Sequence, residues 1–261
     1  MGNPHGSFIW YELMSPDPEG AKTFYDAVVG WDIEPKPAGE LDYRMIRRGD
    51  GGNAGGILKL DQAMQDQGAK PTWLGYVGVD DVDKFVEAAT ARGAHTIMPP
   101  WSVEGIGRMA LIADPQGAVL YVMKPTPPGG DPDATSDVFS VDAKGRVNWN
   151  ELSTSDPQAA LDFYGPLLGW VNHDTMPMGE LGGYHFLDHH DLRFGATCGT
   201  MGGQPPAWRY YIGVDSIERA KAAVEAQGGT PTMGPHEVPG GSWILLGRDP
   251  QGAEFALVGG K

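Results

Sequence analysis

Two glutamates at repeated positions are the residues of this sequence that could do acid–base chemistry. Glu12 stands in WYEL and Glu151 in WNEL, each two residues after a tryptophan in a run that predicts a β-strand. Side chains alternate along a strand, so each carboxylate shares a face with Trp10 or Trp149. A carboxylate near aromatic rings could move a proton or bind a ligand amine. A strand-end glutamate bonded to a neighbouring arginine or backbone amide is the alternative, and the sequence leaves both open.

Aromatic side chains on the predicted strands suggest an apolar pocket with few polar groups, which is typical of small-molecule sites. The predicted ligand-binding residues are Trp10, Tyr76, Tyr121, Trp149, Arg209 and Tyr211, with Trp101 and Trp243 as further candidates. Packing of the same rings into the floor of the protein is the alternative. Arg209 stands where the other repeat has Leu74, so one repeat could bind an anion and the other a neutral ligand.

Three other motifs are interpreted as structural. HFLDHHDL, His185–Leu192, holds an H-x-x-x-H pair, but on a strand that spacing separates the Cα atoms by about 13 Å, so we expect a hairpin tip rather than a zinc site. GDGGNAGG, residues 49–56, precedes a strand and is expected to be a turn rather than a phosphate cradle. Cys198 is expected to be a small apolar side chain, because no nucleophile motif accompanies it.

The chain repeats one plan. With Trp10 aligned to Trp149, an offset of 139, WYELMSPDPEGAKTFYDAVVGW matches WNELSTSDPQAALDFYGPLLGW; at an offset of 135, PTWLGYVGVD matches PAWRYYIGVD and DPQGA recurs. Between the copies runs a stretch rich in Pro, Gly and Asp that cannot support a periodic element. We therefore predict a first domain at residues 1–125, a linker at 126–144 and a second domain at 145–261.

Each copy predicts helices between strands. Asp17 and Asp156 are N-cap residues followed by proline, and an apolar helical face then runs to a glycine. A second helix is predicted from Val82 to Gly93, with a counterpart at residues 217–228. Pro166 is expected to shorten or kink the first helix of the second copy. The order of one strand, one helix and about three strands, twice in each copy, predicts an α+β fold of mixed sheets with helices on one face.

Composition limits the partners. The 261 residues carry a formal charge of -15, so nucleic acids and anionic membrane surfaces would be repelled. Gly and Pro interrupt every apolar run before it reaches the roughly 18 residues of a membrane helix. Cys198 is the only cysteine and the start of the chain does not resemble a signal peptide, so we expect a cytoplasmic protein.

These motifs together resemble a known family. The strand followed by D-P, the A-x-x-F-Y helix with G-W, and the later D-P-x-G-A are similar to the vicinal oxygen chelate superfamily of glyoxalase I, bleomycin-resistance and extradiol-dioxygenase-like proteins. Within it, WYEL, WNEL and DPQGA look most like two-domain, glyoxalase-like or hydroxylase-type proteins of actinobacteria. The resemblance implies two tandem domains, each of two βαβββ modules whose sheets form a cup for a small ligand and often a divalent metal.

Other residues stand where that resemblance places metal ligands. The first-strand histidine falls at Trp10 and Trp149, the second histidine at Leu74 and Arg209 or, one residue earlier, at Trp73 and Trp208, and the last-strand carboxylate at Tyr121 and Ala256. Apart from phenolic oxygen, this set lacks the imidazole, carboxylate or thiolate donors that Zn²⁺, Fe²⁺ or Mn²⁺ needs. We therefore expect no metal ligands at these positions and no other cofactor.

Three functional hypotheses follow. The first is a metal-free small-molecule-binding protein with aromatic cups, acting by sequestration or by lyase or hydroxylase chemistry, with Glu12 and Glu151 as acid–base candidates. The second is a metal-dependent lyase or dioxygenase with displaced ligands. The third is a scaffold for protein contacts whose cups are filled by their own side chains. A monomer with pseudo-symmetric domains and a homodimer are both compatible with the repeat.

Overall fold

The computed structural model describes residues 2–37, 39–131, 133–179, 182–200 and 202–261. The first half contains β1 (Phe8–Ser15), α1 (Pro18–Val29), β2 (Asp32–Ile33), β3 (Tyr43–Arg47), β4 (Asn53–Lys59), α2 (Gln62–Asp66), β5 (Thr72–Gly78), α3 (Val82–Ala91), β6 (His95–Val103), β7 (Gly107–Ala113) and β8 (Val119–Pro125). After a short turn, η1 (Pro128–Gly130), the second half contains β9 (Val147–Thr154), α4 (Pro157–Leu168), β10 (Thr175–Pro177), β11 (Gly183–His189), β12 (Leu192–Gly199), β13 (Ala207–Ser216), α5 (Ile217–Ala226), β14 (Thr230–Glu237), β15 (Trp243–Arg248) and β16 (Glu254–Gly260). The described residues thus contain the predicted module of one strand, one helix and three strands four times.

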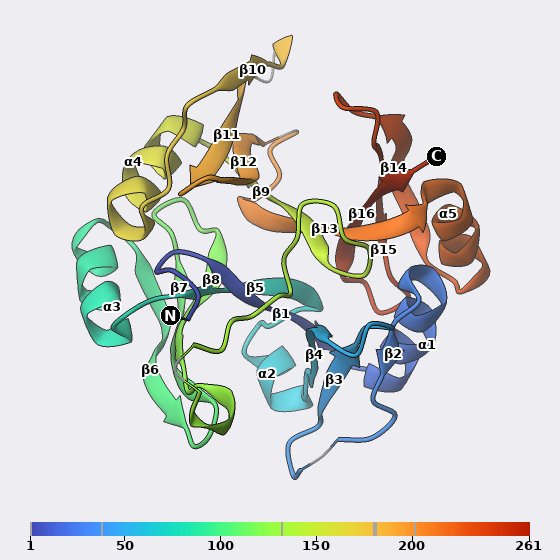
Figure 1. Cartoon of the computed structure of the whole chain (residues 1–261), viewed down its shortest axis with the longest axis horizontal. Coiled ribbons are helices and arrows are strands. Elements are labelled where there is room, and N and C mark those ends of the chain that lie inside the picture. Colours follow the sequence, from blue (N-terminus) through green and yellow to red (C-terminus); the bar gives the residue numbers. More distant parts are fainter. Residues whose placement is uncertain (1, 38, 132, 180–181, 201) are drawn as a thin grey trace. The chain divides into compact units, whose positions relative to one another are not determined.

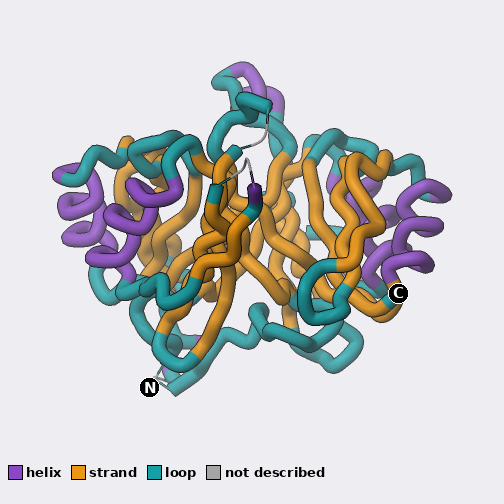
Figure 2. The backbone as a smooth tube through the Cα atoms, turned by 90° about the horizontal axis from the view of Figure 1, so that it is seen from above, coloured by secondary structure: helices purple, strands orange, loops and turns teal. Residues whose placement is uncertain are grey.

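The strands form two sheets of the same design. Over the described residues each sheet has eight strands, in the orders β2-β3-β4-β1-β5-β8-β7-β6 and β10-β11-β12-β9-β13-β16-β15-β14. The first strand of each half runs parallel to the last strand of its own module, whereas the later strands pair antiparallel. The predicted α+β fold of mixed sheets is therefore confirmed. Figure 2 shows the strands in orange and the helices in purple.

The described chain divides into two compact units that interleave in sequence. The first unit comprises residues 1–9, 75–136 and 150–209, and the second comprises residues 10–74, 137–149 and 210–261. In the first unit α3 lies beside α4, and in the second α1 lies beside α5 (Figure 1). Each unit thus joins one module from each half of the chain. The domain boundaries predicted from the sequence repeat concern a different division and stay a prediction.

Local sequence signals define the helices. In α1 the Asp17 carboxylate accepts a hydrogen bond from the Gly20 amide, and Gly30 ends the helix with a left-handed φ of 82°. In α4 Asp156 has the same capping role and Gly169 ends the helix. Pro166 lies inside α4 but does not shorten it, since α4 has 12 residues like α1. So close to the C-terminus a proline removes one intrahelical bond without breaking the earlier turns.

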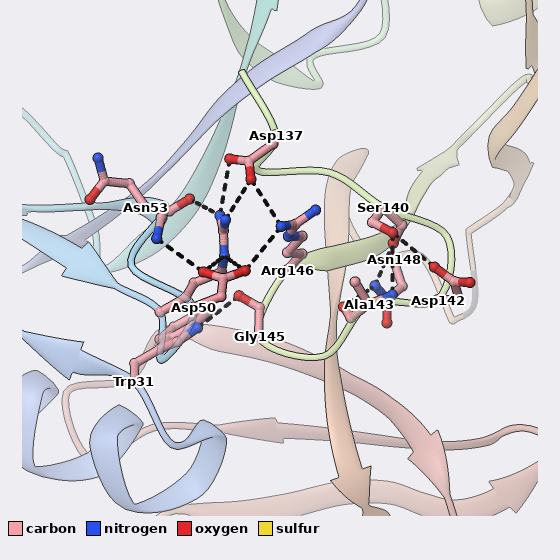
Figure 3. Close-up of polar contacts among 12 residues, drawn as sticks. Trp31, Asp50, Asn53, Asp137, Ser140, Asp142, Ala143, Gly145, Arg146 and Asn148 are labelled. Carbon is pink, nitrogen blue, oxygen red and sulfur yellow. Dashed lines mark hydrogen bonds and ion pairs between the residues drawn. The ribbon is translucent and has the colours of Figure 1, made fainter. Parts of the chain in front are cut away.

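The end of the linker is fastened within the second unit by two arginines. The Asp137 carboxylate lies 2.6 Å from Arg48 Nη2 and 2.9 Å from Arg146 Nη2. Figure 3 shows Asp137 beside Arg146 and Asp50. Asp50 pairs with the same two arginines, and hydrogen bonds from the Gly52 amide and Arg48 lower the pKa of its carboxyl to about 2. The Trp31 indole donates to the Gly145 carbonyl at 2.9 Å beside them. The linker is therefore held before β9 begins.

A membrane-spanning helix was not expected. Among the described residues, every helix is too short or too polar to cross a bilayer.

Candidate functional site

Two tryptophans establish which face of each sheet the helices cover. Trp73 Nε1 donates to Tyr25 Oη at 3.0 Å, and Trp208 Nε1 donates to Tyr164 Oη at 3.3 Å. Both tyrosines belong to helices, so both tryptophans point toward the helical layer. The residue after each tryptophan must then lie on the other face. Leu74 and Arg209 are those residues, which resolves the one-residue ambiguity left by the sequence.

Glu151 lies on the face of β9 that points away from α4. Its neighbour Leu152 lines a small cavity together with Ala160 and Tyr164 of α4, so alternation turns Glu151 to the opposite side. Only 8% of Glu151 is exposed. Its Oε1 atom accepts a bond from Arg209 Nη1 at 2.8 Å, and its Oε2 atom accepts one from Tyr184 Oη at 2.8 Å. Both oxygens of this buried side chain therefore have hydrogen-bond partners.

Three strands build this Glu151 group, defined as Glu151, Arg209 and Tyr184. β9 supplies the carboxylate, β13 the guanidinium and β11 the phenol. The Tyr184 ring lies 5.6 Å from the Phe186 ring, which provides an apolar wall on the same strand. The Arg209 guanidinium and the Tyr184 hydroxyl position the Glu151 carboxylate. The guanidinium can also donate to a ligand, and the Tyr184 and Phe186 rings offer it an aromatic surface.

Cys198 lies near this group on β12. Its register partner is Ser153 of β9, and the Ser153 Oγ to Cys198 Sγ distance is 3.9 Å. Burial, together with the nearby Glu151 charge, raises the pKa of the Cys198 thiol to about 12. The thiol therefore stays protonated at neutral pH and is a poor nucleophile. This fits its interpretation from the sequence as a small apolar side chain.

Glu12 has a different setting in the first sheet. It is buried and pairs in register with Gly56 of β4. Tyr43 of β3, which corresponds to Tyr184, accepts a hydrogen bond from Trp10 Nε1 at 2.7 Å. Leu74 occupies the place of Arg209, so the guanidinium partner of Glu151 has no counterpart at that position. That one copy binds an anion and the other a neutral ligand stays a prediction.

The predicted ligand-binding aromatics form separate groups. In the first unit Tyr76 and Tyr121 stack with ring centroids 4.2 Å apart, and Trp101 meets Tyr121 edge-on at 6.1 Å. In the second unit Tyr211 and Trp149 belong to an apolar cluster with Met233, Ile244, Leu246, Ala256 and Val258. These contacts agree with the packing alternative stated for the rings. Ligand contact by any of them stays a prediction.

Tyr184 and its counterpart Tyr43 were missed by the sequence reasoning. A signal was present, because GELDY at residues 39–43 and GELGGY at residues 179–184 repeat the same letters after loops of different length. The extra glycine displaces the second tyrosine from a fixed offset. A motif search that allows one insertion would have found the pair.

The HFLDHHDL segment forms a hairpin tip, as predicted. β11 and β12 pair antiparallel up to His189 and Leu192, and His190 in the turn has a φ of 52°. The Asp188 carboxylate is bound by Arg193 Nε at 2.9 Å, and hydrogen bonds from Arg193 and His173 lower the pKa of Asp188. The acidic group of this segment is thus engaged in local ion pairs.

Family models match both halves of the chain. The model described as Glyoxalase/Bleomycin resistance protein/Dioxygenase superfamily matches residues 7–122, and the model described as Glyoxalase-like domain matches residues 149–258. The chain belongs to this superfamily. The resemblance drawn from WYEL, WNEL and DPQGA is thereby confirmed.

Relatives of this superfamily member align over nearly their full length. "Putative glyoxylase CFP32" of Mycobacterium bovis is 31% identical, with 97% of this chain and 94% of the relative covered. "Anthracycline biosynthesis protein DnrV" of Streptomyces peucetius is 28% identical, with 97% and 93% covered. The Mn(II)-bound glyoxalase of Novosphingobium aromaticivorans superposes with a TM-score of 0.63 at 16% identity, covering 98% of this chain and 82% of that one. The last similarity concerns the fold.

The residues on the open sheet faces do not fit a divalent metal at the positions expected for this superfamily. Trp10, Leu74 and Tyr121 in the first copy, and Trp149, Arg209 and Ala256 in the second, include no imidazole, carboxylate or thiolate. Glu151 is the nearby carboxylate in the second copy, and both its oxygens accept bonds from Arg209 and Tyr184. A guanidinium 2.8 Å from that carboxylate would repel a cation placed beside it.

Proposed function

We propose that the chain binds a small organic molecule without a divalent metal, and that the Glu151 group is its polar recognition element. The observation that carries the proposal is the Arg209–Glu151–Tyr184 contact on the sheet face that the helices leave open. Burying an ion pair costs desolvation energy that often cancels its attraction, so such a pair is poorly explained by stability alone. A role in recognition gives a reason for placing it there.

The hydrogen-bond donors of Arg209 favour a ligand that carries oxygen atoms. A guanidinium has five N–H donors and can bond a carboxylate and a ligand oxygen at the same time. The names of two Streptomyces relatives mention anthracycline biosynthesis, and anthracyclines are planar aromatic molecules rich in carbonyl and phenol oxygens. Both considerations support an oxygen-bearing aromatic ligand. The acid–base role of Glu151 stays a prediction, and it is sterically compatible with these bonds because each carboxylate oxygen has a second lone pair besides the one that accepts from Tyr184 or Arg209.

Removing the guanidinium tests the proposal. Arg209→Leu installs the residue type that the first copy has at this position, Leu74. We expect the Kd for an anthracycline probe, measured by fluorescence titration, to rise about 10-fold or more, equivalent to at least about 1.4 kcal/mol. Arg108→Leu is the matched control, because it removes an arginine of the same unit that pairs with Asp83 instead. We expect its Kd to stay within about 3-fold of the wild type.

The glutamates are tested in the same titration. Glu12→Gln and Glu151→Gln keep the side-chain shape, so we expect both variants to fold. We expect each of them to bind the anthracycline probe more weakly than the wild type does. Unchanged affinity in both variants would remove the glutamates from the site. Absence of any anthracycline binding by the wild-type chain would contradict the proposed ligand class.

A further inference from the structure

A buried hydrogen-bonded chain links three residues of the second unit. Trp73 Nε1 donates to Tyr25 Oη at 3.0 Å, and Tyr25 Oη donates to Asp249 Oδ2 at 3.1 Å. The other oxygen of Asp249 accepts from the Gln251 and Ala253 amides. All three linked side chains are buried. The hydroxyl of Tyr25 therefore satisfies one polar atom on each side of it.

The first unit contains a second chain of the same design. Trp208 Nε1 donates to Tyr164 Oη at 3.3 Å, and Tyr164 Oη donates to Asp114 Oδ2 at 3.0 Å. Tyr164 is the repeat of Tyr25, and Asp114 and Asp249 are the aspartates of the two DPQGA motifs. We call the two chains the Tyr25 relay and the Tyr164 relay.

Both relays cross from one half of the sequence to the other. The tyrosine and tryptophan of the Tyr25 relay precede the linker and its aspartate follows it, while the Tyr164 relay has the reverse order. Aromatic contacts also join the two halves. The ring centroids of Phe24 and Phe255 are 5.5 Å apart, and those of Phe8 and Trp170 are 5.8 Å apart. Arg48 from the first half also pairs with Asp137 of the linker, and Asp50 pairs with Arg146 of the second half. Each half thus provides what the other half needs to cover its buried groups.

We propose that the two halves of this chain are specific binding partners for each other, and that they remain a complex when the linker between them is cut. Separating the halves would expose the aromatic clusters and break the Tyr25–Asp249 and Tyr164–Asp114 hydrogen bonds, while each tryptophan keeps the tyrosine of its own half. Buried apolar contact drives such association, and the polar relays specify which surfaces meet. The linker is then a tether that raises the local concentration of the halves rather than the element that holds them.

Cleavage of the purified full chain tests this inference. Gly129 and Gly130 lie in an exposed turn where an inserted protease site is accessible. After complete cleavage we expect one species at the mass of the intact chain, 27.9 kDa, by size-exclusion chromatography with light scattering. Separate half-sized fragments, or fragments that reassemble only with copies of themselves, would overturn the inference.

Two tyrosine variants test the part played by the relays. In the cut protein, labelled at its amino terminus and diluted for fluorescence anisotropy, Tyr25→Phe combined with Tyr164→Phe is expected to raise the Kd between the halves about 100-fold or more. Tyr43→Phe is the matched control, since it removes a tryptophan–tyrosine bond that lies wholly within the first half, and a change below about 3-fold is expected. Circular dichroism of the uncut double variant checks that it folds. Equal Kd values for the double variant and the control would overturn the assignment of the relays.

Discussion

Asp249→Ala is expected to lower the free energy of unfolding by about 4 kcal/mol, one of the two largest effects predicted for a single substitution in this chain. The Asp249 carboxylate accepts from Tyr25 Oη, the Gln251 amide and the Ala253 amide. Alanine removes all three acceptor contacts at once and leaves buried donors without a partner. Equilibrium unfolding in urea measures the change, and a loss below about 1 kcal/mol would contradict this description of the site.

Asp249→Asn is the matched control, because asparagine keeps the shape and one carbonyl oxygen. We expect a loss below about 1.5 kcal/mol, since the two amide bonds can persist. The two variants should therefore differ clearly, and equal losses would show that hydrogen bonding by Asp249 is not what stabilises the fold.

The Asp249→Asn variant also tests how the stability of the wild-type chain depends on pH. Burial raises the pKa of the Asp249 carboxyl above its usual range. The folded state then binds this proton more tightly than the unfolded state does. The proton-linked part of the Asp249 contribution to stability is therefore fully present below the unfolded pKa and is lost as pH rises through the raised folded pKa. The hydrogen bonds that the carboxylate accepts from Tyr25 and from the Gln251 and Ala253 amides remain at neutral pH. In Asp249→Asn this part of the slope should disappear, which unfolding measured at several pH values between about 4 and 7 would detect.

Gly195→Ala is expected to cost roughly 3 kcal/mol of stability for a steric reason. Gly195 of β12 pairs with Asn150 of β9, and a Cβ atom at this position would overlap the Asn150 carbonyl oxygen. Because that oxygen belongs to the backbone of a neighbouring strand, relief would require the strands to separate. Thermal and urea unfolding both report the loss.

Gly49→Ala is the control for this substitution. Gly49 has open space where a Cβ atom would lie and does not have a positive φ. We expect its stability to change by less than about 0.5 kcal/mol, with any gain coming from the reduced entropy of the unfolded chain. A stable Gly195→Ala protein, indistinguishable from Gly49→Ala, would mean that β9 and β12 do not approach as closely as described.

Much of the fold could be predicted because its signals are local. The N-cap aspartates, the prolines that follow them and the glycines that end α1 and α4 lie within one short segment each. The repeat at offsets of 139 and 135 shows the same signals a second time in the other copy. The expected shortening of α4 by Pro166 was wrong, because the effect of a proline on helix length depends on its distance from the helix end.

The contacts of the candidate site were less accessible from sequence. Glu151 was singled out, and a neighbouring arginine was named as one alternative partner, but Tyr184 lies 33 positions away on a different strand and does not share a periodic pattern with it. The relays were also missed, because a tyrosine and an aspartate 224 positions apart carry no local sign that they meet. Long-range pairing of this kind depends on tertiary packing, which residue spacing within one element does not encode.

Metal content tests the central claim most directly. The full chain would be produced in medium containing zinc, manganese and iron, purified without chelator, and analysed by mass spectrometry of the elements against protein concentration. We expect less than about 0.1 equivalent of any of these metals per chain, because the expected ligand positions carry tryptophan, leucine, arginine, tyrosine and alanine. About one equivalent of Zn, Mn or Fe per chain, retained through purification, would contradict the account and favour a metal-dependent lyase or dioxygenase with displaced ligands.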